Sequence, residues 1–496
     1  MKYIFSIVTL ITIITLSGYS QGELDALRYS QTFSGGTARS LSMGGAFGAL
    51  GGDFSSLSIN PGGIGVFRGT EISFSPTLFY DKTSSAFSGN SNEDLVYNFN
   101  LNHFGFITTY NTNRKEGWVS VSLGAGYNRL NNFNRNIIIK GVNNENSMMD
   151  YFADMADGNP IDQLYLFEED LAWAAWLIDT VTGNPTEYET VLSEYGDNPN
   201  STYGQEQRRT INSEGSMGEY VFSFGANYSH KLYLGATFGI RKVRYTEISK
   251  HKESDSNKES DPNGEIWDFD YFVFDQWLET RGTGYTFKIG AIYKPIEMLR
   301  IGGAVHLPTF FTLEDDYLTK LEAGYDNGEV YNEDSPNLLY LYELNTPFRA
   351  VGSFALQLKK KALLSIDYEF IDYSNARLRN GEDGHDFYDE NSAIRNAYKA
   401  THNIRAGLEY KLGLLALRGG YAFYDSPYSS SEINKDAGYS SFSGGIGIRE
   451  KSFFIDFAYV YTTHDEEYFM YAHNSLDPAS NNSNTSKFLA TFGFRF

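Results

Sequence analysis

The sequence predicts an all-β protein: a 14-stranded antiparallel transmembrane β-barrel with an N-terminal hatch inside its lumen. Three observations lead to this fold. Aromatic residues make up 16% of the chain and glycine 48 of its 496 residues, a composition typical of long aromatic-rich strands. Fourteen segments alternate apolar and polar side chains with a period of two. The connections between these segments are alternately short and long, as in bacterial membrane barrels.

Residues 1–20 have the features of a secretory signal peptide. Lys2 precedes an apolar run from Ile4 to Leu16, and the small residues Gly18 and Ser20 follow it. No other apolar run approaches the roughly 20 residues that a membrane-spanning helix needs. The mean hydropathy of -0.38 excludes a helical membrane protein, whereas a membrane barrel hides its apolar residues in alternation.

The sequence of residues 21–70 predicts the hatch, a segment that lies inside the barrel lumen. Glycine and other small residues dominate from Gly36 to Gly65, which lets the backbone pack closely in a narrow space. Asn60 is expected to be extended because Pro61 follows it. Gly62 and Gly63 are expected to take positive φ angles, so that the chain turns sharply and enters the barrel wall.

Residues 71–496 predict the barrel. The alternation is clear where Tyr220 and Phe222 fall on one face of a strand and Val221 falls on the other. The fourteen expected strands are 71–81, 98–110, 117–128, 218–229, 231–247, 283–294, 297–306, 347–358, 361–373, 401–411, 414–424, 439–449, 451–463 and 486–496.

The connections predict which end of the barrel faces outward. Short turns are expected at 111–116, 230, 295–296, 359–360, 412–413 and 450, and long loops at 82–97, 129–217, 248–282, 307–346, 374–400, 425–438 and 464–485. Outer-membrane barrels have short periplasmic turns and long external loops, so we expect an outer-membrane location with both termini periplasmic. The chain ends on Phe496 after alternating aromatics, which resembles the sorting signal of such barrels.

The hatch sequence resembles the FadL/TodX family of outer-membrane transporters for hydrophobic compounds. The family signature is a Gly-Ala-rich run, an acidic residue and then Asn-Pro-Ala-Gly. The matching residues are Met43-Gly44-Gly45-Ala46, Gly51-Gly52-Asp53 and Asn60-Pro61-Gly62-Gly63, with Gly62 where the family usually has alanine. The resemblance implies a movable hatch that includes Asp53, Asn60, Pro61, Gly62 and Gly63. It also implies a side exit at a kink in the third strand, where Gly124 and Gly126 are suitable kink positions.

Two expected loops combine aromatic and polar residues in the manner of an exposed binding surface. They lie where the resembled family folds two helical loops around an external groove. A third cluster, from Leu164 to Ile178, predicts an amphipathic helix that either contacts the ligand or packs the loops into a cap. The candidate groove residues are Trp267, Phe269, Phe272, Phe274, Trp277, Phe310 and Phe311.

Charged residues at inward positions have two interpretations. They either form a ladder that braces the lumen, or leave an unpaired cation, such as Lys288 or Arg300, that holds a ligand carboxylate. The inward charges are Arg241, Lys288, Arg300, Arg405, Arg418, Arg495, Asp367, Glu369, Glu409 and Asp456.

The leading hypothesis for function is passive transport of long-chain fatty acids or similar hydrophobic compounds through the groove, the gated hatch and the lateral exit. Burial contributes about 0.8 kcal/mol per CH₂, so capture of a long chain needs no energy coupling. The alternatives are a scaffold or shuttle of a protein secretion system, with secretion-system partners, and a haemin-binding receptor. The sequence carries no axial-ligand pattern for haemin.

Motifs for other functions are absent from the sequence. It contains no nucleophile elbow, no phosphate loop and no Cys/His metal spacing, so we expect no enzyme activity, no catalytic residue, no metal site and no cofactor. The formal net charge of -22 argues against a nucleic-acid partner. The expected partners are a fatty acid-like ligand and the lipid of the outer membrane.

Overall fold

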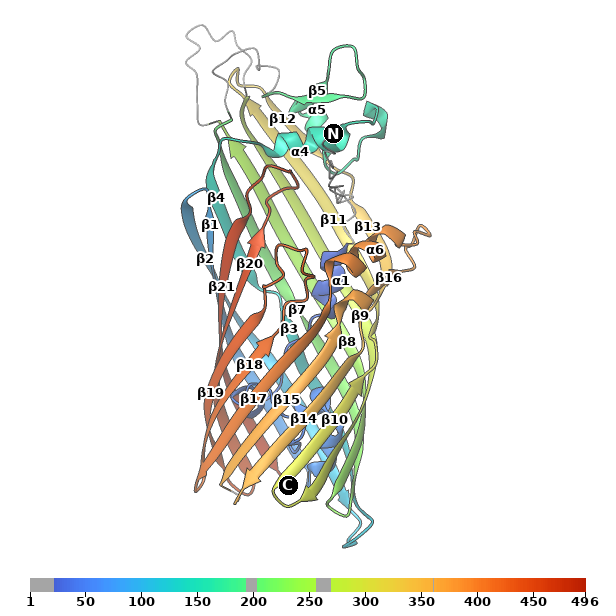
Figure 1. Ribbon diagram of the computed structural model, residues 1–496, viewed down its shortest axis with the longest axis vertical. Helices are drawn as coiled ribbons and strands as arrows, with labels where there is room; N and C mark the ends of the chain where they lie inside the picture. Colours follow the sequence, from blue (N-terminus) through green and yellow to red (C-terminus); the bar gives the residue numbers. More distant parts are fainter. Residues whose placement is uncertain (1–21, 193–202, 256–268, 360) are drawn as a thin grey trace, which may run out of the picture.

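The computed structural model describes residues 22–192, 203–255, 269–359 and 361–496. In these residues, fourteen antiparallel strands form a closed barrel, because the first strand pairs with the last. Figure 1 shows a tall cylinder with the short turns at one end and the helices of the long connections toward the other. The expected signal peptide, residues 1–20, and Trp267 lie outside the described residues.

All fourteen predicted strands are confirmed in position, although several are longer than predicted. They follow one another around the barrel in chain order: β1 (Glu71–Phe87), β2 (Asn90–Asn111), β3 (Trp118–Asn132), β7 (Gln205–Tyr228), β8 (Leu232–Ser254), β9 (Phe269–Ile296), β10 (Leu299–His306), β14 (Arg349–Leu358), β15 (Ala362–Asp372), β17 (Ala400–Leu412), β18 (Leu415–Tyr424), β19 (Tyr439–Arg449), β20 (Phe453–Tyr468) and β21 (Ala479–Arg495).

Much of the sequence expected to form long loops forms strand instead. β7, β8 and β9 have 24, 23 and 28 residues, whereas about 9–11 residues cross a membrane. β4 (Arg135–Asn143), β11 (Phe310–Tyr325), β12 (Val330–Asp334) and β13 (Leu338–Asn345) continue the same sheet. The predictions of loops at 248–282 and 307–346 are therefore wrong over these strands, and the wall rises higher on this side than on the other (Figure 1).

The expected loop 82–97 is also mostly strand. The β1–β2 ladder continues to the pair Phe87–Asn90. Ser88 and Gly89 form the turn with φ angles of 45° and 75°, and positive φ at both positions is the geometry that joins two twisted strands most directly. The connection is a tight hairpin because its alternation continues on both sides of a glycine turn.

Two helices and a small sheet form a cap on the extended wall. They are α4 (Met148–Ala156), α5 (Glu169–Ala174), β5 (Ile178–Thr180) and β6 (Tyr188–Thr190), with the 3₁₀ turn η2 (Ile161–Gln163) between the helices. The amphipathic helix expected over 164–178 is confirmed only for α5, because Trp176 takes a φ of 63° and the chain then enters β5. Of the two interpretations of this cluster, packing into a cap is the one observed.

Apolar side chains cover the outside of the barrel. On β7, Tyr220, Phe222 and Phe224 are exposed, whereas Val221 and Ser223 between them are buried. This alternation fits a wall that faces hydrocarbon on its outside. In the part of the chain that the structure describes, no helix has both the length and the apolar character needed to cross a membrane.

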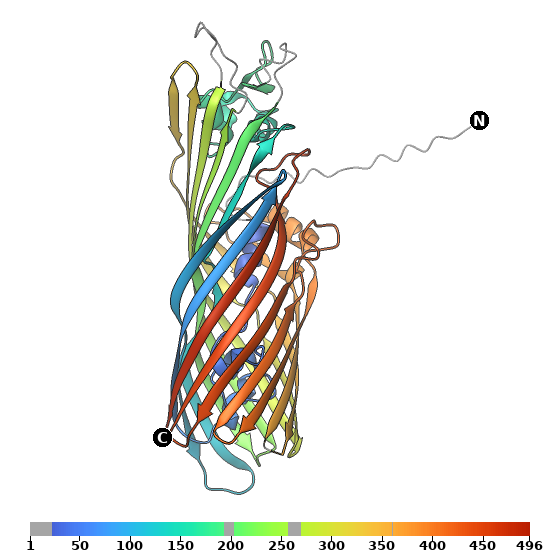
Figure 2. The ribbon, with the colours of Figure 1, turned by 90° about the vertical axis from the view of Figure 1, so that its left-hand side faces the viewer.

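Residues 22–67, which we call the N-terminal segment, lie inside the barrel (Figures 1 and 2). The segment contains α1 (Glu23–Ser30), α2 (Ala38–Leu41), α3 (Ser56–Ile59) and the 3₁₀ turn η1 (Pro61–Val66), and most of its residues are buried. It descends from α1 to the start of β1 at the short-turn end.

The two ends of the described chain lie at different heights. Phe496 lies at the short-turn end, where its backbone N–H donates to Thr70 O at 2.9 Å. Gly22 instead begins α1, which packs beside α6 (Tyr388–Ala397) among the long connections, together with η3 (Tyr373–Asn375) and β16 (Arg377–Arg379). Phe496 thus lies at the short-turn end and the described N-terminal end lies inside the lumen, while the expectation that both termini are periplasmic stays a prediction.

Inward-facing glycines make room for the N-terminal segment. A Cβ at Gly105 would lie 2.3 Å from the ring of Phe54, and one at Gly126 would lie 2.5 Å from the same ring. Both distances are far below van der Waals contact, so any larger residue would displace the segment or the wall.

We predict that Gly126→Ala destabilises the folded barrel by about 1–3 kcal/mol, the usual cost of overpacking. The added methyl group would also lie 2.2 Å from Phe104 O on β2. The measurement is the temperature at which the compact form is lost on semi-native electrophoresis. Gly352→Ala is the matched control, because a Cβ there meets no atom within 4 Å. Equal melting of the two variants would contradict the packing described here.

Candidate functional site

Asp53 holds two turns of the N-terminal segment together. Its carboxylate is buried and accepts hydrogen bonds from Thr37 Oγ1 at 2.8 Å and from Ser55 N at 3.0 Å. A buried carboxylate is tolerated when donors surround it. The acidic residue of the resembled signature therefore acts within the segment as a bracing group.

Asn60 ties the segment to the barrel wall. Its Nδ2 donates to Gly48 O at 2.6 Å and to Ala291 O of β9 at 3.0 Å, while its Oδ1 accepts from Gly62 N at 3.0 Å. Its backbone is extended, with φ -138° and ψ 103°, as expected for a residue before Pro61. Asn60 therefore fixes both the local turn and its distance from the wall.

The expectation of positive φ at Gly62 and Gly63 is wrong. Both residues belong to η1, which begins at Pro61, and the positive φ angles of the segment occur elsewhere, for example at Gly51 and Gly52. Gly62 is needed for another reason: a Cβ there would lie 2.8 Å from Ala291 Cα. The missing side chain permits close approach to β9.

Gly124 and Gly126 lie in uninterrupted ladders with β2 and β7. They accommodate the N-terminal segment, since a Cβ at Gly124 would touch Leu57 and Ile64 at 3.1 Å. The register of β3 with β7 shifts at two other places, between Trp118 and Ser120 and between Arg129 and Asn131. Neither shift coincides with Gly124 or Gly126, and the kink there stays a prediction.

The β2–β3 ladder stops close to the shift between Arg129 and Asn131. Its last pair on the long-connection side is His103–Asn128, beyond which β2 pairs only with β1. A small pocket of about 30 Å³ lies at this break. Its polar lining includes Asn100, Asn102, Arg129, Asn131 and Lys487.

Lys288 is paired, which corrects the hypothesis that it is a free cation. Its Nζ lies 2.5 Å and 2.7 Å from the two carboxylate oxygens of Glu219, and Arg241 lies 3.3 Å from the same carboxylate. Ser58 of the N-terminal segment also donates to Glu219 at 2.9 Å. Arg300 donates to Leu50 O, so it too holds the segment.

The other inward charges form the ladder that the first interpretation predicts. Arg418 bridges Glu409 at 2.8 Å and Asp456 at 2.7 Å, and Arg39 of the N-terminal segment joins Glu409 at 2.9 Å. Glu369 lies 3.6 Å from Arg405. These contacts neutralise charges that water does not reach and connect the wall to the segment.

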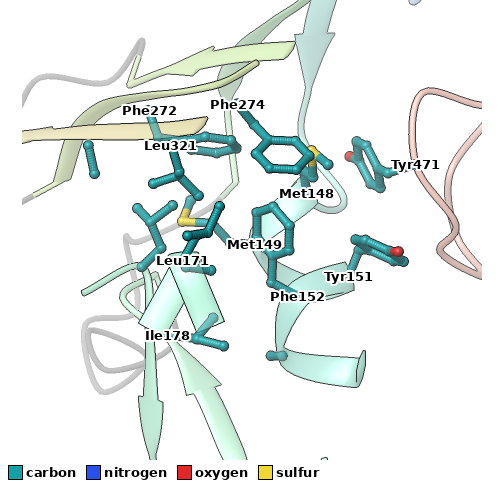
Figure 3. Packing of buried hydrophobic residues seen from close by; sticks show 14 of the residues in the cluster. Met148, Met149, Tyr151, Phe152, Leu171, Ile178, Phe272, Phe274, Leu321 and Tyr471 are labelled. Carbon is teal, nitrogen blue, oxygen red and sulfur yellow. The ribbon is translucent and has the colours of Figure 1, made fainter. Parts of the chain in front are cut away.

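The aromatic residues expected to form an external groove do not form one. Phe269, Phe272 and Phe274 lie on β9 and are fully buried against the cap. Figure 3 shows Phe272 and Phe274 next to Phe152 of α4, at ring-centroid distances of 6.4 Å and 5.5 Å. These rings stabilise the cap, and a ligand could reach them only by displacing it.

The remaining groove candidates are separated from one another. Trp277 is half-buried on β9, and Trp267 is outside the described residues. Phe310 and Phe311 are neighbours on β11, where alternation exposes Phe310 and buries Phe311. The insertion between β10 and β14 is a set of strands rather than the helical loop that the resemblance implies.

The lumen contains a cavity of about 460 Å³ between α1 and the wall. Its lining is mixed. Apolar and aromatic side chains come from distant parts of the chain, among them Leu27, Phe79, Phe133, Tyr245, Tyr424 and Val460, and the carboxylates of Asp81, Glu247 and Glu466 also line it. Its size lies in the range of about 300–1,000 Å³ that is usual for small-molecule sites. Sequence reasoning missed this site because its lining comes from many strands.

Cations border this cavity and the adjoining break in the β2–β3 ladder. Arg28 is paired with Asp25 and lies over the ring of Tyr245 at 4.2 Å, and Arg135 is paired with Glu466 at 2.6 Å. Lys487 lines both the cavity and the pocket at the break.

Arg129 and Lys487 differ from most of the lumenal cations. Among the described residues, neither makes an ion pair with a carboxylate within 4.0 Å, as is also true of Arg300, and the buried Arg129 Nε has no hydrogen-bond partner. Asp81 lines the same cavity as Lys487 but is not ion-paired with it, so the two cations can still bind an anionic group between them. Lys487 and Arg495 are an even number of residues apart on the last strand, so alternation places both side chains on the inner face. The sequence therefore indicated that Lys487 faces the lumen.

Comparisons with solved structures were made on the whole chain. A Pseudomonas aeruginosa FadL homologue superimposes with a TM-score of 0.55, at 12% identity, over 94% of this chain and 100% of that one. The Pseudomonas putida toluene transporter TodX gives a TM-score of 0.54 at 12% identity, over 94% and 100%. The chain has the fold of these FadL and TodX barrels. Comparison of the sequence with protein-family models and with curated proteins returned no match.

The extended wall and the cap of this chain are therefore built on a barrel fold that is already known. The likeness at 12% identity concerns the fold alone, so the side chains that line the cavity must be interpreted from their own contacts. The extended wall and its cap are described above from this chain, and no residue role is carried over from the FadL or TodX barrels.

We predict that Lys288→Met destabilises the barrel by about 3 kcal/mol, because it leaves Glu219 buried with only Arg241 to compensate its charge. The double variant Glu219→Gln/Lys288→Met should recover part of this loss, since the uncompensated charge is then absent. The measurement is the denaturant midpoint of the compact form. A double variant as unstable as the single one would show that the pair acts mainly through packing.

We also predict a pH dependence in the cap. Burial raises the pKa of Glu168 from its ordinary 4.5 to about 7, against a smaller opposing effect of the hydrogen bond that Tyr151 donates to it. Between these pKa values the folded cap binds a proton that the unfolded cap releases. The free energy of opening the cap should therefore fall as the pH rises from about 4.5 to about 7.

The measurement is hydrogen exchange of peptides from 148–178, compared at pH 5 and pH 8 after correction for the intrinsic exchange rate. Glu168→Gln should reduce the difference, because it cannot titrate; burial also raises the pKa of Asp150 and Glu169, so part of the difference should remain. A wild-type cap that is equally protected at both pH values would contradict the effect of Glu168.

Proposed function

We propose that this chain is a passive outer-membrane transporter of hydrophobic small molecules that carry an anionic head, with long-chain fatty acids as the leading class. The observation that carries the proposal is the lumenal cavity of about 460 Å³, which has an apolar and aromatic part and a polar part with Lys487, and which adjoins Arg129 at the break between β2 and β3. Such a site matches a molecule with a long apolar part and one negative charge.

The barrel wall supports an outer-membrane location. Its outer surface is apolar, and its connections are short at one end and long or extended at the other. In this orientation the short turns face the periplasm and the cap faces outward.

The apolar lining supplies the affinity. Burial contributes about 0.8 kcal/mol per CH₂, so a chain of several carbons gains enough free energy to enter without energy coupling. Arg129 and Lys487, which form no ion pair within 4.0 Å among the described residues, add specificity for the head group, because hydrogen bonds to charged groups contribute about 1.5–3 kcal/mol each.

The N-terminal segment acts as the gate in this proposal. It fills the lumen below the cavity, and Asn60, Pro61, Gly62 and Gly63 fix the point where it meets β9. Asp53 keeps the segment compact when it moves. The head group binds beside β2, where the ladder to β3 has ended, and the ligand leaves laterally through the barrel wall. Secretion and haemin binding remain alternatives from the family resemblance, and no contact described here favours either one.

The test is uptake of a labelled long-chain fatty acid by cells that lack their own uptake barrel. The wild-type chain should support uptake above the empty vector. Arg129→Gln/Lys487→Gln should lower fatty acid uptake at limiting concentration by about tenfold or more, in line with the loss of charged hydrogen bonds. It should leave uptake of a neutral hydrocarbon nearly unchanged.

Lys411→Gln is the matched control, because Lys411 lines the separate cavity at the short-turn end. Fatty acid uptake no greater than with the empty vector would overturn the proposed function. Equal fatty acid uptake by the wild type and the double variant would overturn the head-group role alone.

A further inference from the structure

The β-ladder between β1 and β21, which we call the seam, is interrupted near Pro76. The ladder contains the pairs Phe74–Phe492 and Thr77–Leu489, but no pair at Ser75 or Pro76 between them. The register is the same on both sides of the interruption, so the strands remain aligned while their ladder is broken. Pro76 contributes to this, because proline has no N–H to donate.

The other edge of β1 is irregular at the same place. The β1–β2 register shifts between Ser75 and Pro76, which pair with His103 and Leu101, and leaves Asn102 as an extra residue in β2. This is a β-bulge. β1 is therefore weakly held on both edges at the level of Pro76.

An apolar groove of about 530 Å³ lies on the outside of the barrel over this interruption. Its lining includes Pro76, Gly444 and Ala490, and the rings of Phe99 and Phe488 stand beside them, 75% and 52% exposed. Small residues between large aromatic ones leave a depression in the hydrocarbon-facing surface. Figure 2 shows β1 and β21 side by side on the face turned to the viewer.

On the inside, the N-terminal segment closes the same place. Asn102 Nδ2 donates to Gly36 O at 2.7 Å, and Ala38 N donates to Thr491 Oγ1 at 2.7 Å. The hydroxyl groups of Ser75 and Thr491 lie 2.7 Å apart across the seam. Side chains and the N-terminal segment thus replace the missing ladder bonds.

A single apolar layer separates the groove from the lumenal cavity. Leu489 lines the groove and belongs to the buried cluster that contains Leu41. Leu41 in turn lines the lumenal cavity. Movement of α2 away from the wall would therefore join the two spaces through apolar surroundings.

We propose that the β1–β21 seam at Ser75–Pro76 is the passage through which the hydrocarbon chain of the ligand leaves the lumen, and that the outer groove binds this chain. The inference rests on the proposed function and assigns its membrane-side site. The break between β2 and β3 is polar and binds the head group inside the lumen. The seam is closed by hydroxyl groups on its inner side and opens outward onto an apolar groove that suits the tail. The two lie on opposite edges of the β1–β2 hairpin.

A disulfide across the seam tests the passage. The chain has no cysteine, so Ser75→Cys/Thr491→Cys introduces the only pair. Hydroxyl groups 2.7 Å apart place the two Cβ atoms close to the 3.5–4.5 Å that a disulfide requires. Oxidation should lower fatty acid uptake at least fivefold, and reduction should restore it, which separates locking from misfolding.

Ser223→Cys/Thr237→Cys is the matched control. These hydroxyl groups also lie 2.7 Å apart, on the uninterrupted β7–β8 ladder, and Thr237 also contacts the N-terminal segment through Leu57 O at 3.2 Å. Oxidation of this pair should leave uptake unchanged. Normal uptake by the oxidised seam variant, with a normal wild type, would overturn the passage and leave the transport function standing.

A fatty acid that carries a photoreactive diazirine gives a second measurement. In the reduced seam variant it should label peptides that contain Leu78, Ile446 and Phe488, which line the groove, as well as the lumenal cavity. Oxidation should abolish groove labelling and retain lumenal labelling. Groove labelling that survives oxidation would show entry from the bilayer and overturn the inference. A wild type without uptake or lumenal labelling would overturn the proposed function and the inference with it.

Discussion

The close approach between the N-terminal segment and the inner wall constrains the rest of this structure. A Cβ at Gly290 would lie 2.0 Å from Asn60 Oδ1, and one at Gly235 would lie 2.1 Å from Pro61 O. These strands can carry only glycine at those positions while the segment stays where it is. The wall and the segment therefore specify each other, and neither packs correctly alone.

Buried charges strengthen this dependence. Arg39 of the segment joins Glu409 of the wall, and Ser58 and Lys288 meet at Glu219. An ion pair inside a protein stabilises only while both partners stay together, since a lone buried charge is costly. Displacement of the segment must therefore carry Arg39 to another anion or to water. A ligand carboxylate or entering solvent would meet that requirement.

The sequence predicted the barrel well because alternation is a local property. Each of the fourteen strands could be located from its own residues, and the inward charges that alternation selected do form a ladder, for example between Arg405 and Glu369. The extended wall was missed because the aromatic stretch around Phe272 resembled a binding loop, although its pairing with β8 and β11 continues the sheet. Such pairing depends on residues far away in the chain.

The candidate site was harder to predict for the same reason. Lys288 looked unpaired because its partner Glu219 lies two strands away, with β8 between them. The lumenal cavity exists only where α1 meets several strands, so no stretch of sequence describes it. Lys487 lies on the inner face that alternation predicts, but only the structure shows that it shares the cavity with Asp81 without forming an ion pair within 4.0 Å.

The unequal height of the wall gives the barrel a slanted rim. β7 has 24 residues, whereas β17, β18 and β19 have 13, 10 and 11, close to the minimum of about 9–11 that crosses a bilayer. One side of the mouth is therefore lower than the other (Figure 1). In the proposed outer-membrane orientation the low side would sit near the lipid head groups, where sparingly soluble molecules accumulate, so a transporter of this shape would collect them from a two-dimensional film rather than from bulk water.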